Sequence, residues 1–224
     1  MKDQLNTQQR AVLWDMDGTI LDSGDSHWET WRDALALEGF DLTREQFDAT
    51  FGQRNDTILR TYFGPDLPLS EVERIGNAKE ERYREIVRAG KLSLHDGVRA
   101  WLQHLHEQGW KQAIASSAPL LNIEALLETL DIAHYFEAIT SAEDVERGKP
   151  DPQVFLIAAE KLGVSPERCI VVEDAPAGVE AARRAGMRSI GVLTTQATLD
   201  ADLVVERLDQ LPPNAFDSLL VRDA

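Results

Sequence analysis

Four carboxylates of this chain stand where a buried strand would end. Asp15 and Asp17 come directly after the apolar run of residues 11–14, and Glu173 and Asp174 close a second apolar run. In an open sheet of parallel strands, ligands bind outside the carboxyl ends of the strands. Carboxylates gathered at that edge need a neutralising cation, and their hard oxygen atoms suit Mg²⁺. The four acids therefore predict a magnesium site that receives an anionic ligand.

A hydroxyl and an ammonium group complete this set. Ser116 follows a third apolar run, and Lys149 lies in the loop of residues 148–150, ahead of another helical pattern. The alternative is that each acid is only solvated, or that it caps the next helix. That alternative accounts for any one of the acids. It does not account for all of them at strand ends together with a lysine and a serine.

The pattern of the chain indicates how these groups are brought together. Short apolar runs of the kind found in fully buried strands alternate with helical patterns. The runs are residues 11–14, 112–115, 138–140, 169–172 and 188–192, and the helical patterns cover about 97–109, 120–131, 151–162 and 176–185. Such alternation predicts a Rossmann-like α/β core, with a parallel sheet and helices on both of its faces.

Residues 24–92 do not follow this pattern. They contain no buried-strand run, but they contain charged amphipathic stretches, for example residues 28–38 and 70–89. We therefore predict a helical domain, residues 24–92, inserted into an α/β core made of residues 1–23 and 93–224.

Composition narrows the possible partners. The chain has 224 residues with 23 basic and 39 acidic side chains, which gives a net charge of −16. Such a charge repels nucleic acid and anionic membranes, so neither is an expected partner. The single cysteine excludes an internal disulfide. The polar N-terminus and the absence of a long apolar run predict a soluble, cytoplasmic protein.

The order and spacing of these groups resemble a known family. Asp15-Met16-Asp17-Gly18-Thr19, Ser116, Lys149 in Gly-Lys-Pro, and Glu173-Asp174 resemble the four signature motifs of the haloacid dehalogenase superfamily. The resemblance covers essentially the whole chain, and the helical insertion resembles that superfamily's small helical cap. The stretch of residues 171–178 is similar to the branch that contains β-phosphoglucomutase and many sugar-phosphate phosphatases.

The resemblance implies a role for each core residue. Asp15 would attack phosphorus and form an acyl phosphate. Asp17 would give a proton to the leaving oxygen and later take one from water. Ser116 would bind a phosphoryl oxygen, and Lys149 would offset the charge of Asp15 and the phosphoryl group.

The resemblance also implies a metal site and a phosphate-binding turn. Mg²⁺ would be held by Asp174, an oxygen of Asp15 and the backbone carbonyl of Asp17, with Glu173 reaching it through water. The turn after Asp15 would offer backbone N–H groups to the phosphate. The phosphate- and substrate-binding residues implied in this region are Gly18, Thr19 and Ser117.

Three further residues resemble cap and hinge positions of the same branch. Arg54 and Lys79 resemble residues that contact the distal part of a sugar phosphate, and His27 resembles a hinge histidine near the general acid. The alternatives are solvated surface charges for Arg54 and Lys79 and an ordinary helix residue for His27.

Asp17 favours phosphate esters over halides, because an alkoxide leaving group needs a proton and a halide does not. We therefore predict a magnesium-dependent phosphatase for a small phosphorylated metabolite, and we expect a monomer, with a dimer as the open alternative. A β-phosphoglucomutase-like mutase is the nearest rival, although the loop of residues 52–56 lacks that enzyme's serine before Arg54 and is one residue shorter. A catalytically silent binding module is disfavoured because every core motif residue is present.

Overall fold

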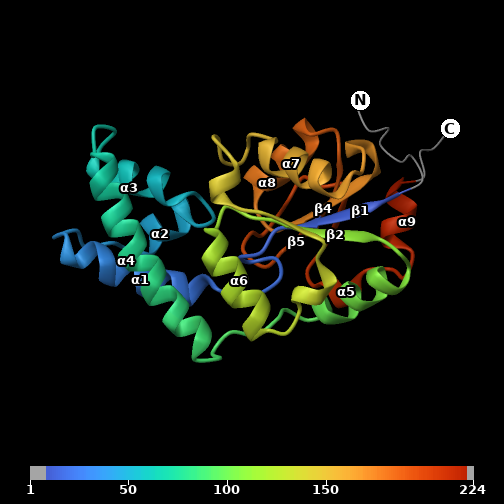
Figure 1. The fold of residues 1–224 in the computed structure, drawn as a ribbon, viewed down its shortest axis with the longest axis horizontal. Coiled ribbons are helices and arrows are strands. Elements are labelled where there is room, and N and C mark those ends of the chain that lie inside the picture. Colours follow the sequence, from blue (N-terminus) through green and yellow to red (C-terminus); the bar gives the residue numbers. More distant parts are fainter. Residues whose placement is uncertain (1–8, 221–224) are drawn as a thin grey trace.

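The computed structural model describes residues 9–220, and its centre is a six-stranded parallel sheet (Figure 1). The order across the sheet is β3-β2-β1-β4-β5-β6. The strands are β1 (Ala11–Trp14), β2 (Lys111–Ala115), β3 (Ala138–Thr140), β4 (Cys169–Glu173), β5 (Arg188–Val192) and β6 (Leu203–Val205). The predicted fold class is confirmed. The edge strand β6 was not predicted, because its three residues are only half-buried and follow a polar stretch.

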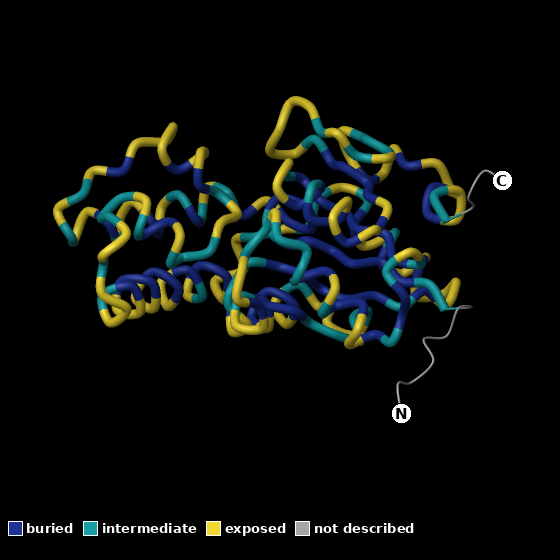
Figure 2. Tube along the Cα trace, turned by 90° about the horizontal axis from the view of Figure 1, so that it is seen from above, coloured by how far each residue is buried: buried dark blue, intermediate teal, exposed yellow. Residues whose placement is uncertain are grey.

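Each face of the sheet has its own apolar core, which explains why the strands read as continuous apolar runs. Val12 and Trp14 of β1 point to one face, and Ala11 and Leu13 point to the other. The first face packs against α5 (Val98–Glu107), α6 (Leu120–Thr129) and α9 (Ala215–Leu220), and the second against α7 (Gln153–Leu162) and α8 (Pro176–Arg184). Both faces are therefore covered, and the strands are buried in the middle of the molecule (Figures 1 and 2).

The strand order creates a crevice between β1 and β4. The chain runs outward from β1 to β2 and β3, and then returns to place β4 on the other side of β1. A reversal of this kind opens a ligand crevice at the carboxyl ends of the two strands that flank it. Asp15 follows β1, and Glu173 is the last residue of β4, so the topology brings these two acids together.

Four helices lie between β1 and α5 in sequence, and they form the part of Figure 1 that stands beside the sheet. They are α1 (Gly24–Leu37), α2 (Arg44–Thr50), α3 (Asn55–Phe63) and α4 (Leu69–Arg88). An apolar cluster of their own, which includes Trp31, Phe47 and Ile58, holds them together. The two connections to the core lie side by side, since Leu21 pairs with Leu94 in an isolated antiparallel bridge. These features support the predicted division of the chain, whose boundaries stay a prediction.

The described chain also contains 3-10 helices at Ala133–Tyr135, Ala142–Asp144, Pro166–Arg168 and Leu208–Gln210.

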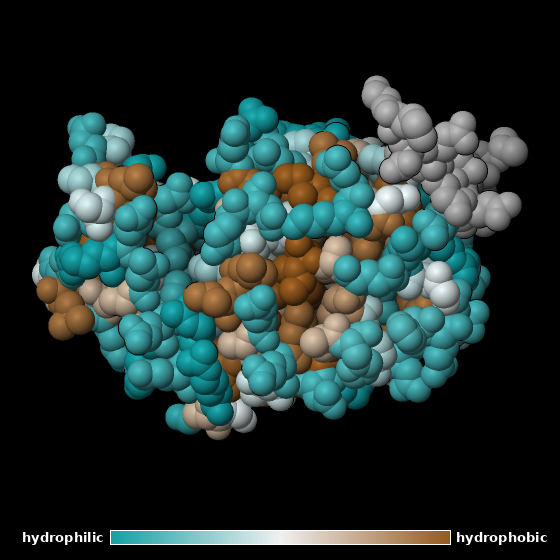
Figure 3. All heavy atoms as spheres, in the orientation of Figure 1, coloured by the Kyte–Doolittle hydropathy of each residue, from teal (hydrophilic) through white to brown (hydrophobic). Residues whose placement is uncertain are grey.

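Hydrophilic side chains dominate the face shown in Figure 3, with apolar side chains gathered near α6. No helix within residues 9–220 is long and apolar enough to cross a membrane. Cys169 is buried in β4, and burial raises the pKa of its thiol to about 12.

Candidate active site

Lys149 links the acids that follow β1 and β4. Its Nζ donates to Asp15 Oδ1 at 2.5 Å and to Glu173 Oε1 at 2.6 Å. Burial alone would lower the pKa of Lys149, but the two carboxylates raise it above its usual range. The other oxygen of Glu173 accepts from the backbone N–H groups of Asp174 and Ala175, at the start of α8. Glu173 is thereby fixed in place, and it holds the lysine against Asp15.

Asp174 is held by two threonine hydroxyls. Thr19 donates to its Oδ1 at 2.9 Å, and Thr195 donates to its Oδ2 at 2.5 Å. Burial and the charge of Glu173 raise the pKa of Asp174 to about 7. Burial also raises the pKa of Asp15 well above its usual range, with Glu173 and Asp174 adding to the effect and Lys149 opposing it.

The excess negative charge of the cluster adds to burial in raising the pKa of Asp15 and Asp174. Asp15, Glu173 and Asp174 are all buried, and one oxygen of each lies within 4.8 Å of the other two. Among the described residues, the one cation paired with this cluster is Lys149, which bridges Asp15 and Glu173. Clustered carboxylate oxygens with an excess of negative charge fit a hard divalent cation such as Mg²⁺.

Two glycines permit the close packing of these acids. A Cβ on Gly18, whose φ is +87°, would lie 2.3 Å from Asp174 Oδ2. A Cβ on Gly178 in α8 would lie 1.7 Å from Glu173 Oε1. The turn itself corrects one expectation. The N–H of Gly18 donates to Leu21 O and that of Thr19 donates to Met16 O, so both groups close the turn instead of pointing to a phosphate.

Asp17 points away from the three-acid cluster, towards α1 and α4. Its Oδ1 accepts from Ser23 Oγ at 2.6 Å and lies 3.2 Å from His27 Nε2 and 3.5 Å from the Tyr83 hydroxyl. Burial would raise the pKa of Asp17, but His27 and the Ser23 hydroxyl lower it to about 2. Asp15 and Asp17 thus sit two residues apart with different surroundings, which suits two different chemical tasks.

A buried polar chain, that is, a series of hydrogen-bonded polar side chains, continues from Asp17 into α4. The ring of His27 stacks on Tyr83, and its Nδ1 lies 2.9 Å from Lys79 Nζ. Lys79 also donates to Glu80 Oε1 at 2.9 Å. Since an ammonium group can only donate, Nδ1 is the acceptor nitrogen and Nε2–H donates to Asp17.

Glu80 is the last member of this series of hydrogen-bonded side chains, and it links α4 to α3 and α6. It accepts from Asn55 of α3 at 2.8 Å and from Asn122 of α6 at 2.5 Å, in addition to Lys79. Arg84 donates to the side-chain oxygen Oδ1 of Asn122 at 2.9 Å. Burial would raise the pKa of Glu80, but the charge of Lys79 lowers it below its usual range.

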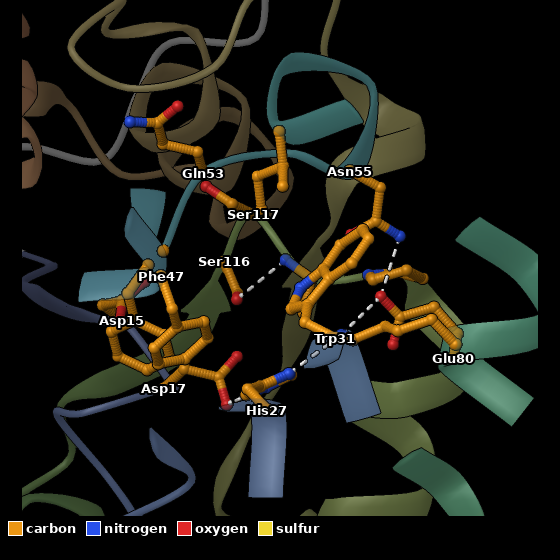
Figure 4. A pocket seen from close by; sticks show the side chains of 16 residues that line it. Asp15, Asp17, His27, Trp31, Phe47, Gln53, Asn55, Glu80, Ser116 and Ser117 are labelled. Atoms are coloured by element: carbon orange, nitrogen blue, oxygen red, sulfur yellow. Dashed lines mark hydrogen bonds and ion pairs between the residues drawn. The ribbon is translucent and has the colours of Figure 1, made fainter. Parts of the chain in front are cut away.

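Asp15 and Asp17 lie at the junction of two spaces. The inner cavity has a volume of about 50 Å³ and lies between the helical insertion and the sheet edge (Figure 4). Besides Asp15 and Asp17, it is lined by His27, Trp31, Phe47, Phe51, Gly52, Gln53, Asn55, Ile58, Lys79, Glu80 and residues 116–119. The outer cleft, of about 650 Å³, opens on the side of Lys149, Glu173 and Asp174.

The remaining predicted residues separate into two groups. Ser116 and Ser117 line the inner cavity beside Asp15, and Ser116 Oγ accepts from the N–H of Ala118 at 3.1 Å. Arg54 lines neither space. Its guanidinium donates to the carbonyl oxygens of Ala142 and Val145, at 3.1 and 2.5 Å, so it joins the insertion to the core.

Several residues at the site were not singled out from the sequence. Thr195 follows the carboxyl end of the apolar run of residues 188–192, so the strand-end pattern could have identified it, although it belongs to no motif. Glu80 follows the predicted Lys79 directly. Two adjacent residues of opposite charge in an amphipathic helix are usually exposed, so nothing in the sequence predicted Glu80 in the site. The two amides that donate to it, Asn55 and Asn122, come from different helices, and they meet at Glu80 only in the folded chain.

Comparisons with known proteins find relatives along most of the chain. The family model of the haloacid dehalogenase-like hydrolases matches residues 9–186. The fructose-1-phosphate phosphatase YqaB of Escherichia coli K12 is 32% identical over 184 residues, which cover 81% of this chain and 95% of that protein. Hexitol phosphatase B of the same organism is 34% identical over 201 residues, covering 87% and 88%. The crystal structure of β-phosphoglucomutase from Clostridium difficile superimposes with a TM-score of 0.84 at 26% identity, covering 95% and 97%.

Proposed function

Because the chain belongs to the haloacid dehalogenase-like hydrolase family, we propose that it is a magnesium-dependent phosphatase. Its substrate is a small phosphorylated metabolite of the sugar-phosphate class, and the reaction passes through an aspartyl phosphate on Asp15. The observation that carries this proposal is the divergence of two neighbouring carboxylates. Asp15 faces Lys149 and the acid cluster, while Asp17 faces the inner cavity and the polar chain of His27.

The first half of the reaction is attack by Asp15. A carboxylate oxygen attacks phosphorus as the bond from phosphorus to the ester oxygen breaks, and the bond electrons leave on that oxygen. Lys149, held by Glu173, keeps a positive charge beside Asp15 and the phosphoryl group. Ser116, at the cavity wall, is placed to donate to a phosphoryl oxygen.

Asp17 serves as acid and then as base. Its pKa of about 2 describes the protein without substrate. The negative charge of a bound phosphoryl group would raise that pKa, since like charges disfavour ionisation. Asp17 then gives its proton to the leaving oxygen. It later takes a proton from the water that attacks phosphorus, and this attack frees the Asp15 carboxylate.

The metal site fits the acid cluster. Asp15, Asp174 and the backbone carbonyl of Asp17 would hold the ion, and Glu173 acts mainly through Lys149, because both of its oxygens are already hydrogen-bonded. When bound, Mg²⁺ supplies positive charge to the phosphoryl oxygens.

Replacing Asp17 with Asn tests its assigned role. Asn keeps the shape but has no proton to give, so we expect formation of the phosphoenzyme from a sugar phosphate to slow by about 10²- to 10⁴-fold. With p-nitrophenyl phosphate, whose phenolate leaves without a proton, the same step should change far less. Single-turnover measurements separate this step from the later hydrolysis. Equal losses with both substrates would remove Asp17 from the role of general acid.

A phosphohexose mutase is the second candidate, because the chain also superimposes on a β-phosphoglucomutase. A mutase must hold a second phosphate in its cap. Arg54 and Lys79 are the cations that resemblance assigns to that task, and both are engaged elsewhere: Arg54 with core carbonyl oxygens, and Lys79 with Glu80 and His27. These contacts support the hydrolase.

The experiment that separates the two functions follows the products over time. The enzyme is incubated with β-glucose 1-phosphate, Mg²⁺ and a trace of glucose 1,6-bisphosphate, and then with other sugar monophosphates. We expect inorganic phosphate to be released from this or another sugar phosphate, with little isomerisation. Rapid, near-quantitative formation of glucose 6-phosphate would establish the mutase instead.

A further inference from the structure

We propose that Glu80 determines the specificity of the inner cavity, which accepts an uncharged polyhydroxyl leaving group and excludes one that carries a second anionic group. This inference rests on the proposed function, because it concerns the leaving group of the phosphate ester that Asp15 attacks. Neither the family membership nor the motif residues assign a role to Glu80 or predict the exclusion of a second anionic group.

The place of Glu80 in the cavity fits contact with the distal end of a substrate. Glu80 is 4% exposed, and it is among the residues that line the inner cavity. In Figure 4, Asp15 and Glu80 lie on opposite sides of this space, with Trp31 between them. A phosphate ester with its phosphorus at Asp15 would therefore extend its leaving group towards Glu80.

The charges around the cavity disfavour a second anion there. Among the described lining residues, Lys79 is the one lysine or arginine, and it is committed to Glu80 and His27. Arg54 lies outside the lining and binds core carbonyl oxygens. A distal carboxylate or phosphate would face the Glu80 carboxylate without an uncommitted cation, and a like-charge pair of this kind is strongly unfavourable.

A hydroxyl group at the distal end of the substrate is favoured instead. Glu80 accepts three hydrogen bonds, from Lys79, Asn55 and Asn122. A carboxylate offers about four acceptor positions, so one position is left. A hydroxyl can donate to it, whereas a carboxylate or phosphate dianion has no proton to donate. The amide of Gln53 and the rings of Trp31 and Phe47 add polar and apolar contacts to the same wall.

The test compares substrates that differ only in the group at the distal end, which is an alcohol or a carboxylate. Glucitol 6-phosphate and 6-phosphogluconate share a six-carbon chain and differ in a terminal CH₂OH or carboxylate, and glycerol 3-phosphate and 3-phosphoglycerate form a shorter pair. We measure kcat/KM for each in the wild type, in Glu80→Gln and in Glu81→Gln. Glu81 is the matched control, since it is the next residue of α4 and is exposed.

We expect the wild type to prefer the alcohol of each pair by on the order of 100-fold. Glu80→Gln should reduce this preference at least about tenfold, partly by a gain on the carboxylate substrate, because Lys79 then lacks its compensating charge. Glu81→Gln should keep the wild-type preference. A variant that merely loosens the fold would slow both members of a pair alike, so the ratio separates specificity from structural damage.

Three results would overturn the inference: equal kcat/KM within the wild-type pairs, preference for the carboxylates, or equal losses on both members in Glu80→Gln. If the variant does not fold, inhibition of p-nitrophenyl phosphate hydrolysis by the paired compounds in the wild type decides, and equal inhibition contradicts the proposal. Absence of any Mg²⁺-dependent hydrolysis, p-nitrophenyl phosphate included, would instead reject the proposed function.

Discussion

Asp15→Asn is expected to give a folded protein with no turnover above background on any phosphate ester, a loss of about 10⁴-fold or more. The amide lacks the charged oxygen that attacks phosphorus, and no neighbouring group can replace it. Asp17 points into a different environment, and Glu173 is fixed by Lys149 and two backbone N–H groups. Phosphate release and circular dichroism measure the two parts of this prediction.

The same substitution should not weaken the fold. Burial, with Glu173 and Asp174, raises the pKa of Asp15, so the ionised group costs free energy in the folded protein at neutral pH. Removing that charge should leave the metal-free protein at least as stable in urea as the wild type. Asp41→Asn, at an exposed aspartate between α1 and α2, is the control and should keep wild-type turnover. Substantial activity in folded Asp15→Asn would place the nucleophile elsewhere.

Removal of the metal is expected to abolish turnover and to lower the melting temperature. Three buried carboxylates form the cluster and two of them pair with Lys149, so binding of Mg²⁺ relieves their repulsion only in the folded state. At 100 times its dissociation constant, Mg²⁺ should stabilise the fold by about 2.7 kcal/mol. For a chain of this size that corresponds to a rise in Tm of roughly 5–10 °C.

Asp174→Asn supplies the matched variant for this experiment. It removes one charge of the cluster, while the hydroxyl of one threonine can still donate to the remaining oxygen and that of the other can accept from the new amide NH2 group. We expect the Mg²⁺-induced rise in Tm to shrink and activity to require far more metal. Chelator should stop phosphate release by the wild type, and added Mg²⁺ should restore it. Full activity in excess chelator would contradict the roles given to Asp15 and Asp174.

The acid cluster could be predicted because the end of a buried strand is recognisable in the sequence itself. An apolar run that ends in Asp15 or in Glu173 and Asp174 marks both the strand and its carboxyl edge, and parallel order then brings these acids together. The missed strand β6 shows the limit of this signal. Its residues, Leu203–Val205, are only half-buried, so the run is short and does not stand out.

The residues of the helical insertion were harder to place, because their partners lie in the core. A motif position does not tell whether Arg54 points into the cavity or to the carbonyl oxygens of Ala142 and Val145. The burial of Glu80 likewise depends on Asn122, which is 42 residues away along the chain. Long-range contacts of this kind follow from packing, and periodicity does not encode them.

The central claim is that phosphorus becomes bonded to Asp15, and reductive trapping tests it most directly. Borohydride reduces an acyl phosphate of aspartate to homoserine, which labels the residue that carried the phosphoryl group. The experiment uses Asp17→Asn during turnover of p-nitrophenyl phosphate, since this variant forms the phosphoenzyme and lacks the base that assists its hydrolysis. We predict homoserine at position 15 in the digested protein, dependent on substrate and Mg²⁺. Homoserine at another position, or none at position 15 while substrate is consumed, would contradict the account.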